Sequence, residues 1–90
     1  MGVANVGVCF DRTFPPSALH EYTERAESGG LDQLWIIEDC FFTAGISLAA
    51  TALSRTNGLT VGLGILPAVA RNPAITAMEV ATLANLAPGR

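Results

Sequence analysis

The chain has 90 residues, enough for one small domain, but 50% of them are hydrophobic and only 14% are charged. A small domain exposes a large share of its surface, so a chain this apolar is expected to be covered by further protein. The net charge of −3 and the scatter of the five Lys and Arg residues argue against nucleic acid as a partner, and no apolar run reaches the roughly 18 residues of a membrane span.

The first predicted elements are a buried strand over residues 3–10 and a helix over residues 16–28. The strand is a short run rich in β-branched residues that ends before polar residues and two prolines. The helix has proline in its first turn, apolar residues at helical spacing and a pair of glycines as its stop. Asp11 and Arg12 follow the strand, where they are expected to pair with one another or with loop backbone.

A second strand is predicted over residues 31–37, and it ends in Glu38 and Asp39 ahead of a helix over residues 45–54. Ligands bind at the carboxyl ends of the strands in parallel α/β folds, so one of these two carboxylates is a candidate to project into a site. The alternative is helix capping or hydrogen bonding within the loop, as is usual for loop aspartates.

The strongest β signal lies at residues 58–69, an apolar run that Pro67 ends, and it predicts a central parallel strand buried on both faces. Gly62 and Gly64 within this run allow two interpretations: relief of crowding against a helix, or a bulge pressed against a flat ligand. A Rossmann phosphate loop is disfavoured, because the G-x-G-x-x-G pattern needs glycine where the proline stands.

A third helix is predicted to begin at Asn72 and Pro73, an N-cap followed by proline at the first helical position. Strand starts near residues 3, 31 and 59 recur about every 28 residues, which suits βα units in a parallel sheet. Three such units form an arc with two open sheet edges. The sequence therefore predicts an α/β fold and the N-terminal portion of a longer protein, with a complete small domain that assembles through its open edges as the alternative.

The single histidine, His20, falls on the polar side of the first helix, which leaves no histidine for Ser-His-Asp or Cys-His catalysis or for metal binding. Cys9 and Cys40 lack the spacing of a zinc site or a disulfide framework, and such cysteines fit a reducing cytoplasm. The N-terminus shows neither the charged region nor the cleavage pattern of a signal peptide. We therefore expect a cytoplasmic protein with free thiols and no metal.

Two long segments of the chain resemble a known enzyme family. Residues 25–39 (RAESGGLDQLWIIED) resemble the first helix and second strand of the bacterial luciferase-like oxidoreductases, which depend on a flavin or on the deazaflavin F420. Residues 55–67 (RTNGLTVGLGILP), 71–73 and 83–90 are similar to the same family in the same order. The resemblance covers nearly the whole chain, and it implies a (β/α)₈ TIM barrel of which residues 1–90 supply the first three βα units, as the N-terminal fragment of one barrel domain.

The resemblance also implies positions for a site. In the family a bulge at the end of the third strand, often with a non-prolyl cis peptide, backs the cofactor ring, and it corresponds here to the Gly64-Ile65 bond or, nearly as well, to Leu63-Gly64. An acidic or histidine position after the second strand corresponds to Asp39, with Glu38 beside it. These two acids are thus the expected catalytic residues, and Gly64, Ile65 and Asp39 the expected cofactor contacts.

The implied activity is hydride transfer between the reduced cofactor and a small organic substrate, or a monooxygenase reaction in which the reduced flavin activates O₂. A histidine follows the second strand in some F420-dependent members, whereas Cys40 stands here, which leaves FMN and F420 both open. The full-length protein is expected to be a homo-oligomer, and the isolated 90 residues are expected to be inactive because the remaining cofactor contacts lie beyond Arg90. A non-catalytic flavin-binding or structural βα protein is the alternative, since a fold alone does not imply activity.

Overall fold

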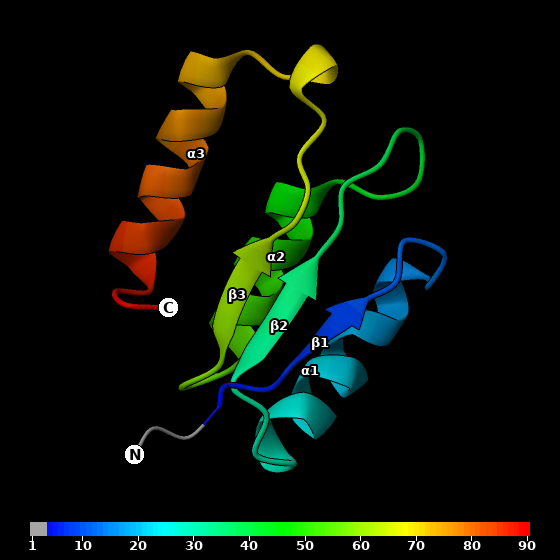
Figure 1. Cartoon of the computed structure of the whole chain (residues 1–90), viewed down its shortest axis with the longest axis vertical. Helices are drawn as coiled ribbons and strands as arrows, with labels where there is room; N and C mark the ends of the chain where they lie inside the picture. The colour runs from blue at the N-terminus through cyan, green and yellow to red at the C-terminus, as the bar shows by residue number, and fades with distance from the viewer. Residues whose placement is uncertain (1–3) are drawn as a thin grey trace.

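The computed structural model describes residues 4–90, which form a parallel three-stranded sheet with helices between and after the strands (Figure 1). The strands are β1 (Gly7–Phe10), β2 (Gln33–Ile36) and β3 (Thr60–Leu63), and they pair in the order β1-β2-β3. The α-helices are α1 (Leu19–Ser28), α2 (Gly45–Arg55) and α3 (Pro73–Leu86), and short 3₁₀ turns occupy Pro16–Ala18 and Ala68–Ala70. The predicted alternation of strand and helix is confirmed.

The hydrophobic core lies between the sheet and two helices that share one of its faces. Figure 1 shows α1 and α2 behind the sheet, with α3 beyond β3. Alternate residues of a strand point to opposite faces, so Leu34 and Ile36 of β2 are fully buried against these helices. Trp35, between them, faces the other way and is 42% exposed. The sheet thus has one packed face and one open face.

The amino-terminal strand is shorter than predicted. Residue 3 lies outside the described residues, and residues 4–6 precede β1 without joining the sheet ladder. Val6 instead makes loop hydrogen bonds: its carbonyl accepts from the amides of Asp32 and Gln33, and its amide donates to Asp32 Oδ2 at 2.8 Å. These bonds hold the amino ends of β1 and β2 together.

The prediction that β3 is central and buried on both faces is wrong for the described residues. The central strand is β2, because β1 and β3 pair with its two edges, and β3 is an edge strand whose residues are half-buried or exposed. Its outer edge is covered at one point, where the Val61 amide donates to the Arg90 carbonyl at 2.8 Å. The Arg90 guanidinium also donates to the Leu59 carbonyl at 3.0 Å and to Thr56 Oγ1 at 2.6 Å.

The helix boundaries follow the signals in the sequence. Gly30, in the left-handed conformation with φ of 80°, ends α1, as predicted from the glycine pair. Asn72 caps α3 by accepting the Ala74 amide at 2.8 Å, and Pro73 is the first helical residue, so the predicted start is confirmed. None of the helices within residues 4–90 has the length and apolar character to cross a membrane.

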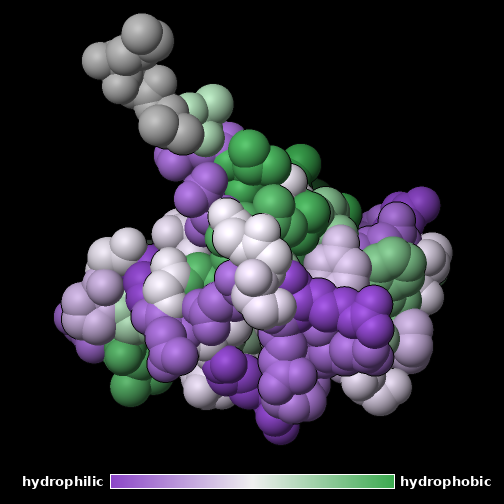
Figure 2. All heavy atoms as spheres, turned by 90° about the horizontal axis from the view of Figure 1, so that it is seen from below, coloured by the Kyte–Doolittle hydropathy of each residue, from purple (hydrophilic) through white to green (hydrophobic). Residues whose placement is uncertain are grey.

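The molecule has surfaces of contrasting character. Figure 2, which views the end where the strands begin, shows a mostly hydrophilic surface with hydrophobic side chains gathered on one side near the amino terminus. Helix α3 has no buried residue and exposes Ile75, Met78, Val80 and Leu86. A helix that is apolar all round is typical of one enclosed in a larger protein.

Candidate functional site

The predicted site residues lie together where the strands end. Parallel strands bring their carboxyl ends to one edge of the sheet, so the β2–α2 loop (37–44) and the β3–α3 loop (64–72) are neighbours (Figure 1). Their backbones are joined directly: the Glu38 amide donates to the Ile65 carbonyl at 3.0 Å, and the Gly64 amide donates to the Ile36 carbonyl at 2.8 Å. Asp39 follows Glu38 in the same loop.

The Gly64-Ile65 peptide bond is cis, as the resemblance predicted, and the Cys40-Phe41 bond is cis as well, which the sequence did not indicate. The Ile65 side chain is 74% exposed and Phe41 and Phe42 are exposed beside the carboxyl end of β2. This edge of the sheet therefore presents apolar side chains as well as carboxylates.

The glycines of β3 accommodate a tryptophan. Gly62 pairs with Trp35 in the sheet register, and a Cβ placed on Gly62 would lie 2.5 Å from Trp35 Cε3, while one on Gly64 would lie 3.0 Å from the same atom. The crowding relieved by Gly62 and Gly64 therefore comes from an indole on the neighbouring strand, and the interpretation that it comes from a helix is wrong. Trp35 Nε1 donates to Gln33 Oε1 at 3.0 Å, and this hydrogen bond favours the observed orientation of the ring.

Asp39 is held by an arginine from the preceding loop. Arg12 Nη1 donates to Asp39 Oδ2, and the Arg12 guanidinium carbon lies 4.9 Å from the centre of the Phe42 ring. Both members of the Arg12–Asp39 pair are about half exposed. An exposed pair of this kind contributes no more than about 1 kcal/mol, so the Asp39 carboxylate can exchange partners at low cost.

Arg12 does not pair with Asp11, so that expectation is wrong. Asp11 instead accepts the Thr13 amide at 2.8 Å and the Thr13 hydroxyl at 2.6 Å, which confirms its predicted bond to loop backbone. These hydrogen bonds from Thr13 lower the pKa of Asp11. Residues 11–14 form a turn, in which the Phe14 amide donates to the Asp11 carbonyl at 3.0 Å. The Asp11 side chain bonds within this turn, whereas Arg12 reaches the loop after β2.

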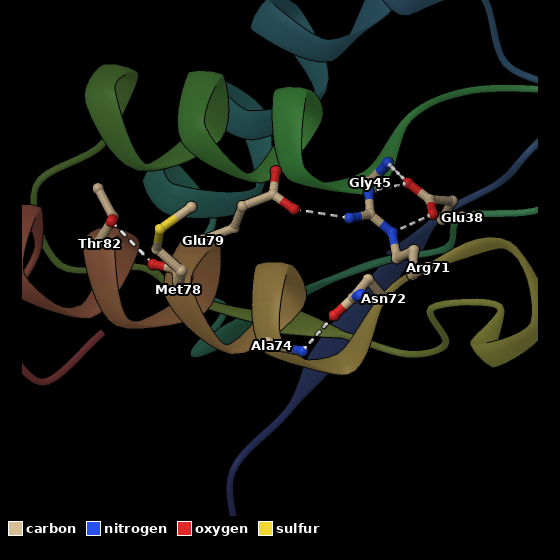
Figure 3. Close-up of polar contacts among 8 residues, drawn as sticks. All are labelled: Glu38, Gly45, Arg71, Asn72, Ala74, Met78, Glu79 and Thr82. Carbon is tan, nitrogen blue, oxygen red and sulfur yellow. Dashed lines mark hydrogen bonds and ion pairs between the residues drawn. The ribbon is translucent and has the colours of Figure 1, made fainter.

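Glu38 is enclosed by hydrogen-bond donors. Its Oε1 accepts from Arg71 Nε at 2.5 Å, and its Oε2 accepts from Arg71 Nη2 at 2.7 Å and from the Gly45 amide at 2.6 Å (Figure 3). Arg71 Nη1 also donates to Glu79 Oε1 at 2.8 Å. The hydrogen bonds that Arg71 donates to Glu38 lower the pKa of Glu38, and the same bonds raise the pKa of Arg71. Glu38 therefore remains ionised at neutral pH, which favours a structural role over proton transfer.

Neither cysteine forms a disulfide, and both residues are exposed. Partial burial, with the nearby Asp11 charge, raises the pKa of Cys9, so this thiol has little thiolate character at neutral pH. Within residues 4–90, no group of three or more His, Cys, Asp or Glu side chains is placed to hold a metal ion. Residues 38–44 of the β2–α2 loop line an open hollow of about 320 Å³. The Thr43 hydroxyl on this hollow is buried and makes no hydrogen bond with the described residues.

Sequence reasoning missed Arg71, Glu79 and the contacts of Trp35. Arg71 lies 33 positions after Glu38, so no local spacing connects the two. The usable signal was topological: once the loops after β2 and β3 are placed at one sheet edge, an acid in one and a base in the other become candidate partners. The sequence did not indicate which of Glu38 and Asp39 that partner would be.

The chain is similar to a known protein family and to several curated proteins. Residues 4–90 match the family described as luciferase-like monooxygenase. The chain is 31% identical over 86 residues to an F420-dependent glucose-6-phosphate dehydrogenase of Kineococcus radiotolerans (86% of this chain, 26% of that protein). It is 31% identical over 85 residues to a 5,10-methylenetetrahydromethanopterin reductase of Methanolobus tindarius (93% of this chain, 26% of that protein). An F420-dependent glucose-6-phosphate dehydrogenase of Kribbella flavida is 35% identical over 86 residues (86% and 26%).

The chain thus spans about a quarter of the length of these curated relatives, 26% in each case. The family match covers more of the chain than any single motif, and it agrees with the order of strands and helices and with the sheet edge at which the site residues gather. The chain belongs to the luciferase-like monooxygenase family.

Proposed function

We propose that the chain forms the first three βα units of a (β/α)₈ barrel oxidoreductase that transfers hydride between coenzyme F420 and a small organic substrate. The observation that carries the proposal is the contact between the loop that carries Asp39 and the Gly64-Ile65 segment, where the Glu38 amide donates to the Ile65 carbonyl at the carboxyl edge of the sheet. The chain that makes this contact matches the family over residues 4–90. Two of the relatives above are F420-dependent by name, which supports F420 as the cofactor.

The residues at this edge fit a flat ring with polar groups on its rim. Ile65 exposes an apolar side chain, and Asp39 offers a carboxylate whose present partner, Arg12, is an exposed residue. When bound, the deazaflavin would supply the hydride chemistry. Ile65 would provide apolar contact to the ring, and Asp39 would accept an N–H or O–H hydrogen bond from the ring or the substrate. Glu38, which contacts Arg71 and Gly45, would act by holding Asp39 in place.

FMN is the second candidate cofactor, with a monooxygenase reaction, because the family itself is described as luciferase-like monooxygenase. The proposal includes a homo-oligomeric, cytoplasmic enzyme, and the exposed apolar surface of α3 supports contact with further protein. A non-catalytic βα protein remains the alternative from a different class.

The test is a titration of the full-length protein with oxidised F420 and, separately, with FMN, followed by turnover assays with each reduced cofactor. Saturable F420 binding, at least about tenfold tighter than FMN binding, is expected; this corresponds to 1.4 kcal/mol. Tighter binding of FMN together with consumption of O₂ would support the monooxygenase. Binding of neither cofactor would favour the non-catalytic alternative.

A further inference from the structure

Three charged side chains from separate segments form one cluster at the carboxyl edge of the sheet. Glu38 comes from the β2–α2 loop, Arg71 from the β3–α3 loop and Glu79 from the second turn of α3 (Figure 3). We call this group the Glu38–Arg71–Glu79 clamp. Its side chains are 10%, 18% and 32% exposed, respectively, and Arg71 uses all three guanidinium nitrogens in it.

The clamp joins the two loops that carry the proposed cofactor contacts. Glu38 precedes Asp39 directly, and its amide donates to the Ile65 carbonyl at 3.0 Å. Arg71 lies at the other end of the loop that starts with Gly64 and Ile65, just before the N-cap of α3. The β3–α3 loop is therefore tied to the end of β2 by backbone at Gly64 and Ile65 and by side chain at Arg71.

The same carboxylate also organises the start of α2. Ala44, at the N-cap of α2, makes no side-chain capping bond, and Glu38 Oε2 supplies the missing acceptor for the Gly45 amide at 2.6 Å. A Cβ at position 45 would lie 3.0 Å from the Cβ of Glu38 and 3.1 Å from Leu66 Cδ2, so a larger residue there would require these side chains to shift. The helix, the β2–α2 loop and the β3–α3 loop thus meet at one carboxylate.

The chemistry of the clamp makes it sensitive to small changes. An arginine fork matches both oxygens of a carboxylate, whereas a lysine offers a single point charge, so Arg71→Lys keeps the charge but loses the paired geometry. Removing one member of a largely buried pair leaves the other charge without compensation. Glu79 contributes only the outermost of the contacts, at Nη1, and is the most exposed of the three.

We propose that Glu38, Arg71 and Glu79 are positioning residues, which fix Asp39 and Ile65 relative to one another for binding of the cofactor. This inference rests on the proposed function, and it gives Glu38 a role through its neighbours instead of through contact with the reacting atoms. The clamp couples the loops 37–44 and 64–72, so that loosening it releases both together.

Glu27 provides a matched control at the opposite end of the sheet. Its carboxylate accepts the amides of Asn57, Gly58 and Leu59, at 2.9, 2.8 and 3.2 Å for Oε2, and so anchors the loop that precedes β3. Glu27→Gln therefore replaces a carboxylate that holds a loop with a neutral amide, as Glu38→Gln does. Glu27, however, lies at the edge of the sheet where the strands begin, away from Asp39 and Ile65. A loss that came only from lower overall stability would appear in both variants.

The experiment compares the full-length wild type with Glu38→Gln, Arg71→Lys, Glu79→Gln and Glu27→Gln. Amide hydrogen exchange without cofactor is measured first, followed by titration with F420 and FMN. Faster exchange is expected in both loops, 37–44 and 64–72, for Glu38→Gln, with smaller increases for Arg71→Lys and then Glu79→Gln. Affinity for the bound cofactor is expected to fall about tenfold in Glu38→Gln, because small displacements of positioning groups are costly. Glu27→Gln should change exchange only near residues 57–59 and leave affinity within about twofold.

The proposal is overturned if exchange rises in only one of the two loops, or if Glu38→Gln and Glu27→Gln weaken cofactor binding equally. Should Glu38→Gln fail to fold, the milder Arg71→Lys and Glu79→Gln variants carry the same comparison. If the wild type binds neither cofactor, the proposed function fails. The exchange pattern then still decides whether the clamp couples the loops.

Discussion

The close approach of Trp35 to the glycines of β3 predicts that Gly62→Ala destabilises the protein through the indole ring. A Cβ at position 62 would lie 2.5, 2.7 and 2.8 Å from Trp35 Cε3, Cζ3 and Cδ2, against the 3.4 Å at which ordinary contact begins. The ring would have to recede by about 1 Å and strain its hydrogen bond to Gln33 Oε1. Overpacking of this kind costs about 1–3 kcal/mol, and the partial exposure of Trp35 places the expected loss toward the lower end.

The assay is urea unfolding of the full-length protein, monitored by circular dichroism. This signal does not depend on tryptophan fluorescence, so variants without Trp35 can be compared with the wild type. Gly62→Ala is measured in the wild type and in a Trp35→Leu background, where the ring is absent. Coupling between the two positions of about 1 kcal/mol or more is expected, since residues in contact are not additive. Gly58→Ala is the control: its Cβ would meet no atom within 4 Å, so a neutral or slightly stabilising effect is expected. Equal losses for Gly62→Ala in both backgrounds would refute the reasoning.

Further predictions concern the core, the helix start, the amino edge and the end of β3. Leu34→Ala removes a fully buried side chain and should cost about 2–5 kcal/mol in urea unfolding, whereas a loss below about 1 kcal/mol would contradict its burial. Asn72→Ala removes the N-cap of α3 and should cost about 1 kcal/mol, with Asn72→Asp restoring most of it. Backbone hydrogen bonds, first from the amides of residues 58 and 57, lower the pKa of Glu27 from its ordinary 4.5, so the stabilisation by Glu27 is present above pH 4.5 and is lost as the pH falls through the folded value. The difference in urea midpoint between wild type and Glu27→Gln should therefore shrink below pH 4.5. A difference that stays constant with pH would count against this role of Glu27. Gly64→Val, whose Cβ would lie 3.0 Å from the indole, should weaken cofactor binding in a titration, and unchanged affinity would argue against a cofactor role for this segment.

The order of strands and helices could be predicted because each element has its own signal in a short stretch of the sequence. The short apolar run at 34–37, between a glycine pair and Glu38, marks β2, and Asn72 with the following proline marks the start of α3. The place of β3 in the sheet could not be predicted in this way. An apolar run indicates burial, but the order of strands depends on which strands pair, and the run at 60–63 contains no information on its partners.

The site could be predicted only to the level of which loops meet. Asp39 and the Gly64-Ile65 segment were placed correctly at one edge, by topology and by the family resemblance. The partner of each charge could not be predicted, because Arg12 had a nearer carboxylate in the chain and Arg71 had two adjacent carboxylates to choose from. These choices depend on side-chain direction in the folded loops, which neither spacing nor composition reports.

The central claim is that this chain supplies part of a cofactor site at the carboxyl edge of its sheet. The most direct measurement is the F420 affinity of full-length wild type, Asp39→Ala and Glu27→Gln, with FMN titrated in parallel. Saturable F420 binding is predicted, weakened about tenfold by Asp39→Ala, the usual scale for losing a charged hydrogen bond, and unaffected by Glu27→Gln. Absence of saturable binding of either cofactor, or equal affinity in all three proteins, would contradict the claim.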